Sequence, residues 1–141
     1  MTYRVLIVDD DDKVRELLRR FLEPEGYEVM AAASAEEGVQ LIEAAPPSVA
    51  FCDVHMTGAN GLWLADQIRS LSPATAMVLA TGDDRVPTSE SLRAGIVSYL
   101  IKPLRRDRVV TAAADGVRWS EDAIAGGAHR RPRPRLGPAL D

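Results

Sequence analysis

Short runs of apolar residues alternate along this chain with longer segments in which apolar residues recur every three or four positions. Apolar runs of four to eight residues are typical of buried strands, whereas the three-to-four spacing is typical of amphipathic helices. The pattern predicts strands over about residues 3–8, 27–32, 49–53, 76–80 and 97–101. It predicts helices over about residues 12–22, 34–45, 62–72, 88–94 and 105–119.

Residues at the ends of these segments support the predicted boundaries. Ser34 followed by Glu37 is a capping box that opens a helix. Pro24 and Gly26 end the first helix, and Gly95 ends the fourth. Strands that are nearly continuous apolar runs and that alternate with helices indicate a parallel sheet covered on both faces. We therefore expect a doubly wound α/β fold with five strands in the flavodoxin-like order 2-1-3-4-5.

Composition is ordinary for one globular domain. The 141 residues are 46% hydrophobic and 27% charged. No segment approaches the roughly 18 uninterrupted apolar residues of a membrane span. Cys52 is the single cysteine, so an intrachain disulfide is excluded and the cytoplasm is the expected compartment.

Charge is distributed unevenly between the two parts of the chain. Residues 1–122 carry 13 Lys and Arg against 20 Asp and Glu, a net charge of −7, whereas residues 123–141 carry 4 against 1, a net charge of +3. An acidic body repels nucleic acid, so we expect no direct nucleic-acid binding by residues 1–122. Residues 123–141 are rich in Arg, Pro and Gly and lack apolar periodicity, and we interpret them as a flexible tail or interdomain linker.

Polar residues follow four of the five predicted strands, where ligand sites form in open parallel sheets. Asp9 and Asp10 follow the first strand, Asp53 ends the third, Thr81 follows the fourth and Lys102 follows the fifth. The second strand ends in three alanines and lies at the edge of the expected sheet. We therefore expect the five polar side chains to converge on one cleft.

The residue types at this cleft indicate phosphoryl chemistry. Crowded carboxylates repel one another unless a cation neutralises them, and Mg²⁺ usually takes one or two carboxylates together with water and phosphate oxygens. Lys102 adds a positive charge suited to a phosphoryl oxygen, and Thr81 adds a hydroxyl donor. These are the parts needed for phosphoryl transfer, with Asp53 as the nucleophile that forms an acyl phosphate.

Residues 3–120 resemble the receiver domain of two-component response regulators of the chemotaxis-regulator type. The resemblance rests on four motifs that occur in order, namely Val8-Asp9-Asp10, Cys52-Asp53-Val54-His55-Met56-Thr57-Gly58, Ala80-Thr81-Gly82 and Tyr99-Leu100-Ile101-Lys102-Pro103. It implies that Asp53 accepts a phosphoryl group from a sensor histidine kinase or a phosphotransfer protein, with Mg²⁺ or Mn²⁺ as the cofactor. A protein of this kind is a signalling switch rather than an enzyme.

The resemblance also implies individual roles. The implied metal ligands are Asp10 directly, Asp9 through water, Asp53, and the backbone carbonyl of His55. Lys102 and Thr81 would contact the phosphoryl group. Thr81 and Tyr99 would form a switch pair, in which the hydroxyl moves toward the phosphoryl group and the ring turns inward.

Phosphorylation is expected to act on the surface formed by residues 88–94, 97–101 and 105–119. This surface would control a downstream target or an output domain, and a homodimer through the same surface is a further expectation.

A phosphohydrolase of the haloacid-dehalogenase type is the alternative function. Such enzymes also use Mg²⁺ and a strand-end Asp nucleophile, and Asp9-x-Asp11 matches their motif superficially. The chain is short for that family and lacks a substrate cap. We interpret Asp11 and Asp12 as helix-start acids instead, because acidic residues are favoured by the helix dipole there.

Overall fold

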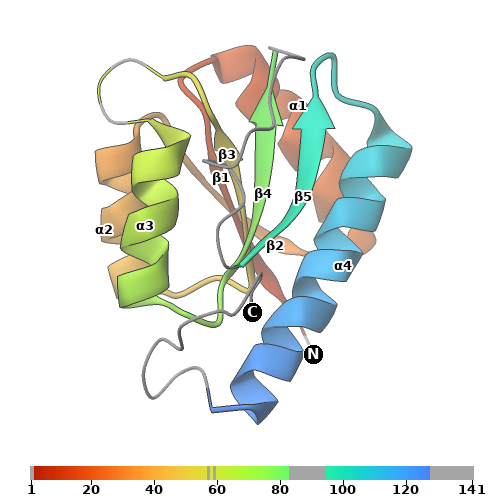
Figure 1. Cartoon of the computed structure of the whole chain (residues 1–141). Coiled ribbons are helices and arrows are strands. Elements are labelled where there is room, and N and C mark those ends of the chain that lie inside the picture. Colours follow the sequence, from red (N-terminus) through yellow and green to blue (C-terminus); the bar gives the residue numbers. More distant parts are fainter. Residues whose placement is uncertain (1, 57, 59, 83–94, 128–141) are drawn as a thin grey trace.

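The computed structural model describes residues 2–56, 58, 60–82 and 95–127 (Figure 1). Its elements are β1 (Arg4–Val8), α1 (Asp12–Leu22), the short 3₁₀ helix η1 (Glu23–Glu25), β2 (Glu28–Ala32), α2 (Ala35–Ala44), β3 (Val49–Asp53), α3 (Gly61–Leu71), β4 (Ala76–Thr81), β5 (Ile96–Ile101) and α4 (Arg106–Ala125). All five strands and the first three helices lie within one residue of their predicted bounds. The helix predicted over residues 88–94 lies outside the described residues.

The five strands form one parallel sheet in the order β2-β1-β3-β4-β5. Helices α2 and α3 lie on one face of this sheet, and α1 and α4 lie on the other (Figure 1). The predicted fold class and strand order are therefore confirmed. Because all strands are parallel, their carboxyl ends meet along one edge, where β1, β3 and β4 are neighbours.

Each face of the sheet has its own apolar core, because side chains alternate along a strand. In β3, Phe51 packs in the core under α1 and α4, whereas Cys52 packs in the core under α2 and α3. The four residues Val5–Val8 are at most 1% exposed. Burial on both faces explains why the strands are continuous apolar runs rather than alternating ones.

Helix α2 begins with the predicted capping box. The Ser34 hydroxyl accepts a hydrogen bond from the Glu37 amide at 3.1 Å, which satisfies an amide that has no partner within the helix. The Glu37 carboxylate accepts in return from the amide of Ala33 at 2.8 Å, one residue earlier than in the usual form of the box.

Helix α4 is longer than predicted. It was expected to end at Trp119 and instead continues to Ala125, so residues 123–125 are helical and are not part of the predicted tail. Ser120 is buried at 3% exposure, and no glycine or proline occurs between Trp119 and Gly126 to end the helix earlier. Neither α4 nor any other described helix is long and apolar enough to cross a membrane.

Candidate functional site

Three carboxylates meet at the carboxyl edge of the sheet. Asp9 follows β1 and is 2% exposed, and Asp53 ends β3 and is 6% exposed. Asp10 follows Asp9 and is exposed to solvent. Each of the three residues offers one carboxylate oxygen, and these oxygens all lie within 4.8 Å of one another. The convergence predicted from the strand ends is therefore present for all three acids.

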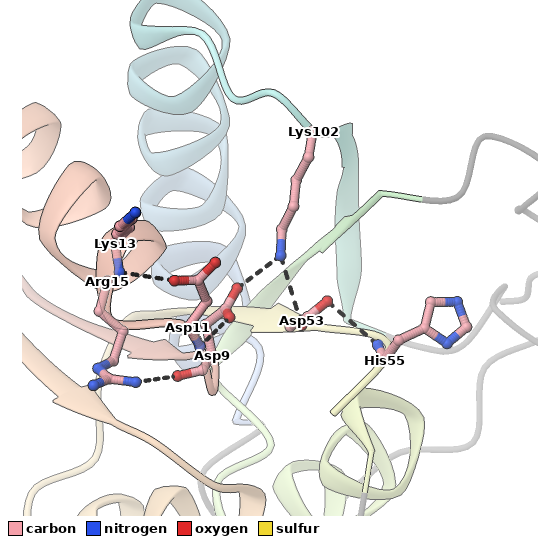
Figure 2. Close-up of polar contacts among 7 residues, drawn as sticks. All are labelled: Asp9, Asp11, Lys13, Arg15, Asp53, His55 and Lys102. Carbon is pink, nitrogen blue, oxygen red and sulfur yellow. Dashed lines mark hydrogen bonds and ion pairs between the residues drawn. The ribbon is translucent and has the colours of Figure 1, made fainter. Parts of the chain in front are cut away.

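Lys102 lies over the two buried carboxylates (Figure 2). Its Nζ atom donates a hydrogen bond to Oδ2 of Asp9 at 3.0 Å and lies 3.6 Å from Oδ2 of Asp53. The Lys102 backbone amide donates to the carbonyl oxygen of Thr81 at 2.8 Å, which ties this residue to the end of β4. One ammonium group thus serves two carboxylates, and it is closer to Asp9.

Burial and like charges control protonation at this site. Burial raises the pKa of Asp53, and the neighbouring charge of Asp9 raises it further, against the opposing effects of Lys102 and the His55 amide. Burial lowers the pKa of Lys102, but its hydrogen bond with Asp9 and the charges of Asp9 and Asp53 outweigh burial and leave that pKa raised. The site therefore favours positive charge next to the carboxylates.

Asp9 is held by donors on several sides. Its Oδ1 atom accepts from the Asp11 amide at 2.9 Å, and its backbone carbonyl accepts from Nη1 of Arg15 at 2.7 Å. The Asp11 carboxylate accepts from the Lys13 amide at 2.9 Å and caps α1, whose first turn contains Asp12. The interpretation of Asp11 and Asp12 as helix-start acids is confirmed, and Asp11 does not supply the second acid that the phosphohydrolase motif requires.

Asp53 is held by the loop that follows β3. The His55 amide donates to Oδ1 of Asp53 at 3.3 Å, while the His55 ring extends away from the carboxylates (Figure 2). Gly61, the first residue of α3, donates its amide to the carbonyl of Val54 at 3.3 Å. A Cβ atom at Gly61 would lie 2.4 Å from the carbonyl oxygen of Asp53, so a glycine is needed for this close approach.

The two proposed switch residues lie on neighbouring strands. Thr81 ends β4 and is fully buried, and it pairs with Ile101 of β5. Tyr99 lies two residues before Ile101, so it shares a sheet face with Thr81. The ring of Tyr99 is half-buried against the core under α2 and α3, and its hydroxyl is buried without a hydrogen-bond partner among the described residues.

The donor set fits a hard divalent cation. All three acids present oxygen ligands, which Mg²⁺ and Mn²⁺ prefer, and two of them are buried close together. The raised pKa of Asp53 has like charge as one of its causes, which is the condition that a bound cation relieves.

Two contacts of the site were not predicted from the sequence. Arg15 occurs in the amphipathic pattern of α1 as an ordinary polar residue, and nothing in the pattern indicates that it reaches the Asp9 carbonyl. Gly61 was not recognised because its role depends on how α3 packs against the end of β3. Its place next to the helix cap Asn60 is the one local signal available.

The fold and the site together define a class of protein, the flavodoxin-like domains that carry a cluster of acids and a lysine at the carboxyl edge of the sheet. Residues 5–114 match the family model of the response regulator receiver domain. The chain therefore belongs to the response regulator receiver family, and the resemblance noted from its motifs is confirmed.

Relatives and solved structures agree with this assignment. The chain is 34% identical over 130 residues to the transcriptional regulatory protein AruR of Pseudomonas aeruginosa, which covers 89% of this chain and 53% of AruR. It is 36% identical over 113 residues to the probable C4-dicarboxylate response regulator DctR of Priestia megaterium, covering 78% of this chain and 50% of DctR. The chain thus spans about half the length of these curated relatives. Nothing in these matches supports the phosphohydrolase alternative.

A solved structure extends the agreement to the fold. The CheY-like response regulator receiver domain protein from Methanospirillum hungatei superposes with a TM-score of 0.80 at 31% sequence identity. The match covers 86% of this chain and 98% of that protein. The shared fold thus extends over nearly the whole of that receiver domain protein.

Proposed function

We propose that this chain is a phosphorylation-controlled switch in which Asp53 accepts a phosphoryl group from a sensor histidine kinase or a phosphotransfer protein. The observation that supports this most strongly is the position of Asp53 at a strand end. Its carboxylate lies within 4.8 Å of two further acids and 3.6 Å from the ammonium group of Lys102. Acids, an ammonium group and a strand-end nucleophile at one site are the components of phosphoryl transfer.

In the proposed reaction, a carboxylate oxygen of Asp53 attacks the phosphorus atom of a phosphohistidine. A phosphorus–oxygen bond forms as the phosphorus–nitrogen bond breaks, and the leaving imidazole keeps the electron pair and takes up a proton. Lys102 counteracts the raised pKa of Asp53 and so favours the ionised carboxylate that the attack requires. Its ammonium group then contacts a phosphoryl oxygen of the product.

Asp9, Asp10, Asp53 and the backbone carbonyl of His55 would hold Mg²⁺ or Mn²⁺. A bound cation of this kind supplies positive charge that stabilises the oxygens of the transferring phosphoryl group. Asp10 is exposed and accessible for direct ligation, whereas Asp9 is buried and already accepts from Lys102 and Asp11, which suits contact through water. His55 remains a proposed ligand on the basis of the family resemblance.

Thr81 and Tyr99 would carry the signal away from Asp53. The proposal is that the Thr81 hydroxyl moves toward the phosphoryl group and that the Tyr99 ring follows it inward. Their common sheet face supports this coupling.

The signal would reach either a downstream protein or an output domain. AruR and DctR are regulators about twice as long as the part that this chain matches. By analogy with them, the proposed role of this chain is to control an output rather than to turn over a substrate. The surface of β5 and α4 is the proposed contact region, and a homodimer through it stays a proposal.

Intact-mass spectrometry after incubation with a small phosphodonor and Mg²⁺ tests the proposal. The wild-type chain should gain the mass of one phosphoryl group, and Asp53→Asn should gain none. Asp11→Asn is the matched control, because asparagine caps a helix as well as aspartate does and the same loop is altered. Absence of an adduct on the wild-type chain, or an unchanged adduct on Asp53→Asn, would contradict the proposed role.

A further inference from the structure

Arg15 of α1 contacts the acidic loop that joins β1 to α1, residues 9–11 (Figure 2). One nitrogen of its guanidinium, Nη1, donates to the backbone carbonyl of Asp9 at 2.7 Å. The other, Nη2, forms an ion pair with the carboxylate of Asp12. The Arg15 side chain is only 21% exposed, although α1 is a surface helix. One guanidinium therefore bridges both ends of the turn that joins β1 to α1.

This bridge fixes the peptide group between Asp9 and Asp10. Because that peptide group is planar, holding the Asp9 carbonyl also fixes the direction in which the Asp10 backbone continues. The Asp9 carboxylate is separately held by the Asp11 amide and Lys102. Arg15 thus restrains the backbone from which both acids project, while the other donors restrain the Asp9 side chain itself.

We propose that Arg15 is a positioning residue for the divalent-cation site, acting through the Asp9 carbonyl rather than by touching the ion. This inference rests on the proposed function, since it assumes that Asp9 and Asp10 bind Mg²⁺. Outer partners that orient metal ligands typically contribute 10- to 100-fold to metal affinity. Arginine suits the task because its planar fork donates to two acceptors at once, which a lysine ammonium does not do with the same geometry.

Charge alone would have the opposite effect. A cationic side chain next to the site repels Mg²⁺, so its removal would tighten binding. Asp12 offsets the charge of Arg15, which leaves orientation as the larger effect. The sign of the change in Mg²⁺ affinity therefore separates a positioning role from a purely electrostatic one.

The test is isothermal titration of Mg²⁺ into the full chain and three variants. We expect Arg15→Gln to weaken Mg²⁺ affinity by about 10-fold. Arg15→Lys keeps the charge but loses the two-point bridge, and it should also weaken affinity, by a smaller factor. Lys13→Gln is the matched control, because it removes one positive charge from the same helix turn and its backbone amide, not its side chain, caps α1. That variant should bind Mg²⁺ as tightly as the wild-type chain or slightly more tightly.

Thermal unfolding in a chelator separates positioning from general destabilisation. Two changes are compared in Arg15→Gln: the fall in its melting temperature in the chelator, and the reduction in the further rise that Mg²⁺ produces. A positioning role predicts that the reduction is larger than the fall. Unchanged or tighter Mg²⁺ binding by Arg15→Gln, with normal binding by the wild-type chain, would overturn this inference and leave the proposed function intact. If Arg15→Gln does not fold, wild-type affinity in Arg15→Lys would overturn it equally. A wild-type chain that binds no Mg²⁺ would overturn both proposals.

Discussion

The Nζ atom of Lys102 lies 3.0 Å from Oδ2 of Asp9, closer than the 3.6 Å that separates it from Oδ2 of Asp53. Lys102 is therefore hydrogen-bonded to an acid other than the proposed phosphoacceptor. A phosphoryl group on Asp53 would bring new negative charge close to the Lys102 ammonium group, on the side of Asp53 rather than Asp9. The short distance to both acids means that Lys102 can change its partner by a rotation of its side chain, without movement of the backbone.

Removal of this ammonium group should slow phosphorylation without weakening cation binding. Lys102→Gln is expected to slow phosphorylation by a small phosphodonor by about 100-fold or more, the usual effect of losing one charge-stabilising donor. Mg²⁺ affinity should stay the same or increase, because a competing cation leaves Asp9. Arg105→Gln removes an exposed charge close in sequence and serves as the control. Equal phosphorylation rates in Lys102→Gln and the wild-type chain would contradict this account.

Stability should depend on pH through Asp53. Because its pKa is raised in the folded state above the ordinary value of 3.8, the folded state binds the proton more tightly than the unfolded state does. The resulting stabilisation is present below pH 3.8 and is lost as pH rises through the folded-state pKa. Asp53→Asn should therefore unfold at higher urea concentration than the wild-type chain near neutral pH without metal, by on the order of 1 kcal/mol. This difference should shrink toward pH 3.8, and a difference independent of pH would refute the explanation.

A divalent cation should stabilise the fold by binding the acidic cluster. At a Mg²⁺ concentration about 100 times its dissociation constant, the free energy of unfolding should rise by about 2.7 kcal/mol. Asp10→Asn should reduce this gain because the exposed acid of the cluster is lost, whereas Asp11→Asn should retain it because Asp11 caps α1. Denaturant unfolding with Mg²⁺ and with a chelator measures both effects. Equal gains in the two variants would argue against a site at Asp10.

The close approach of α3 to the acceptor strand should make Gly61 sensitive to substitution. In Gly61→Ala the added Cβ would lie 2.4 Å from the Asp53 carbonyl oxygen and 3.2 Å from Val54 Cα, so backbone atoms must shift. We expect a loss of about 1–3 kcal/mol in the free energy of unfolding, together with slower phosphorylation. Gly126→Ala is the control, because its Cβ would meet atoms at 3.5 Å and 3.6 Å, which are ordinary contact distances. If Gly61→Ala were as stable as the wild-type chain, the close approach of α3 to β3 would not require a glycine at this position.

The sheet and the acids at its edge could be predicted because they depend on local patterns. Continuous apolar runs located the strands, and parallel topology then placed Asp9, Asp53 and Lys102 at one edge. The N-terminal cap of α2 and the acids at the start of α1 were predictable for the same reason, since both involve residues only a few positions apart. Such features follow from sequence separations of a few residues combined with one topological rule.

The remaining features depend on side-chain geometry and packing that no periodicity encodes. The preference of Lys102 for Asp9 follows from side-chain geometry between residues 93 positions apart, which no periodicity encodes. The end of α4 was misplaced because Ser120 is a polar residue in the sequence, although in the structure it is buried. The contacts of Arg15 and Gly61 are close in sequence, but each is made with backbone atoms at the end of a strand and depends on how the helix packs there.

The central claim is that Asp53, and neither of the neighbouring acids, carries the phosphoryl group. Borohydride reduction after phosphorylation converts an aspartyl phosphate to homoserine, and peptide sequencing by mass spectrometry then locates the converted residue. The account predicts homoserine at position 53, dependent on Mg²⁺, with Asp9 and Asp10 unchanged. Conversion at position 9 or 10 instead, or no conversion after exposure to a phosphodonor, would contradict it.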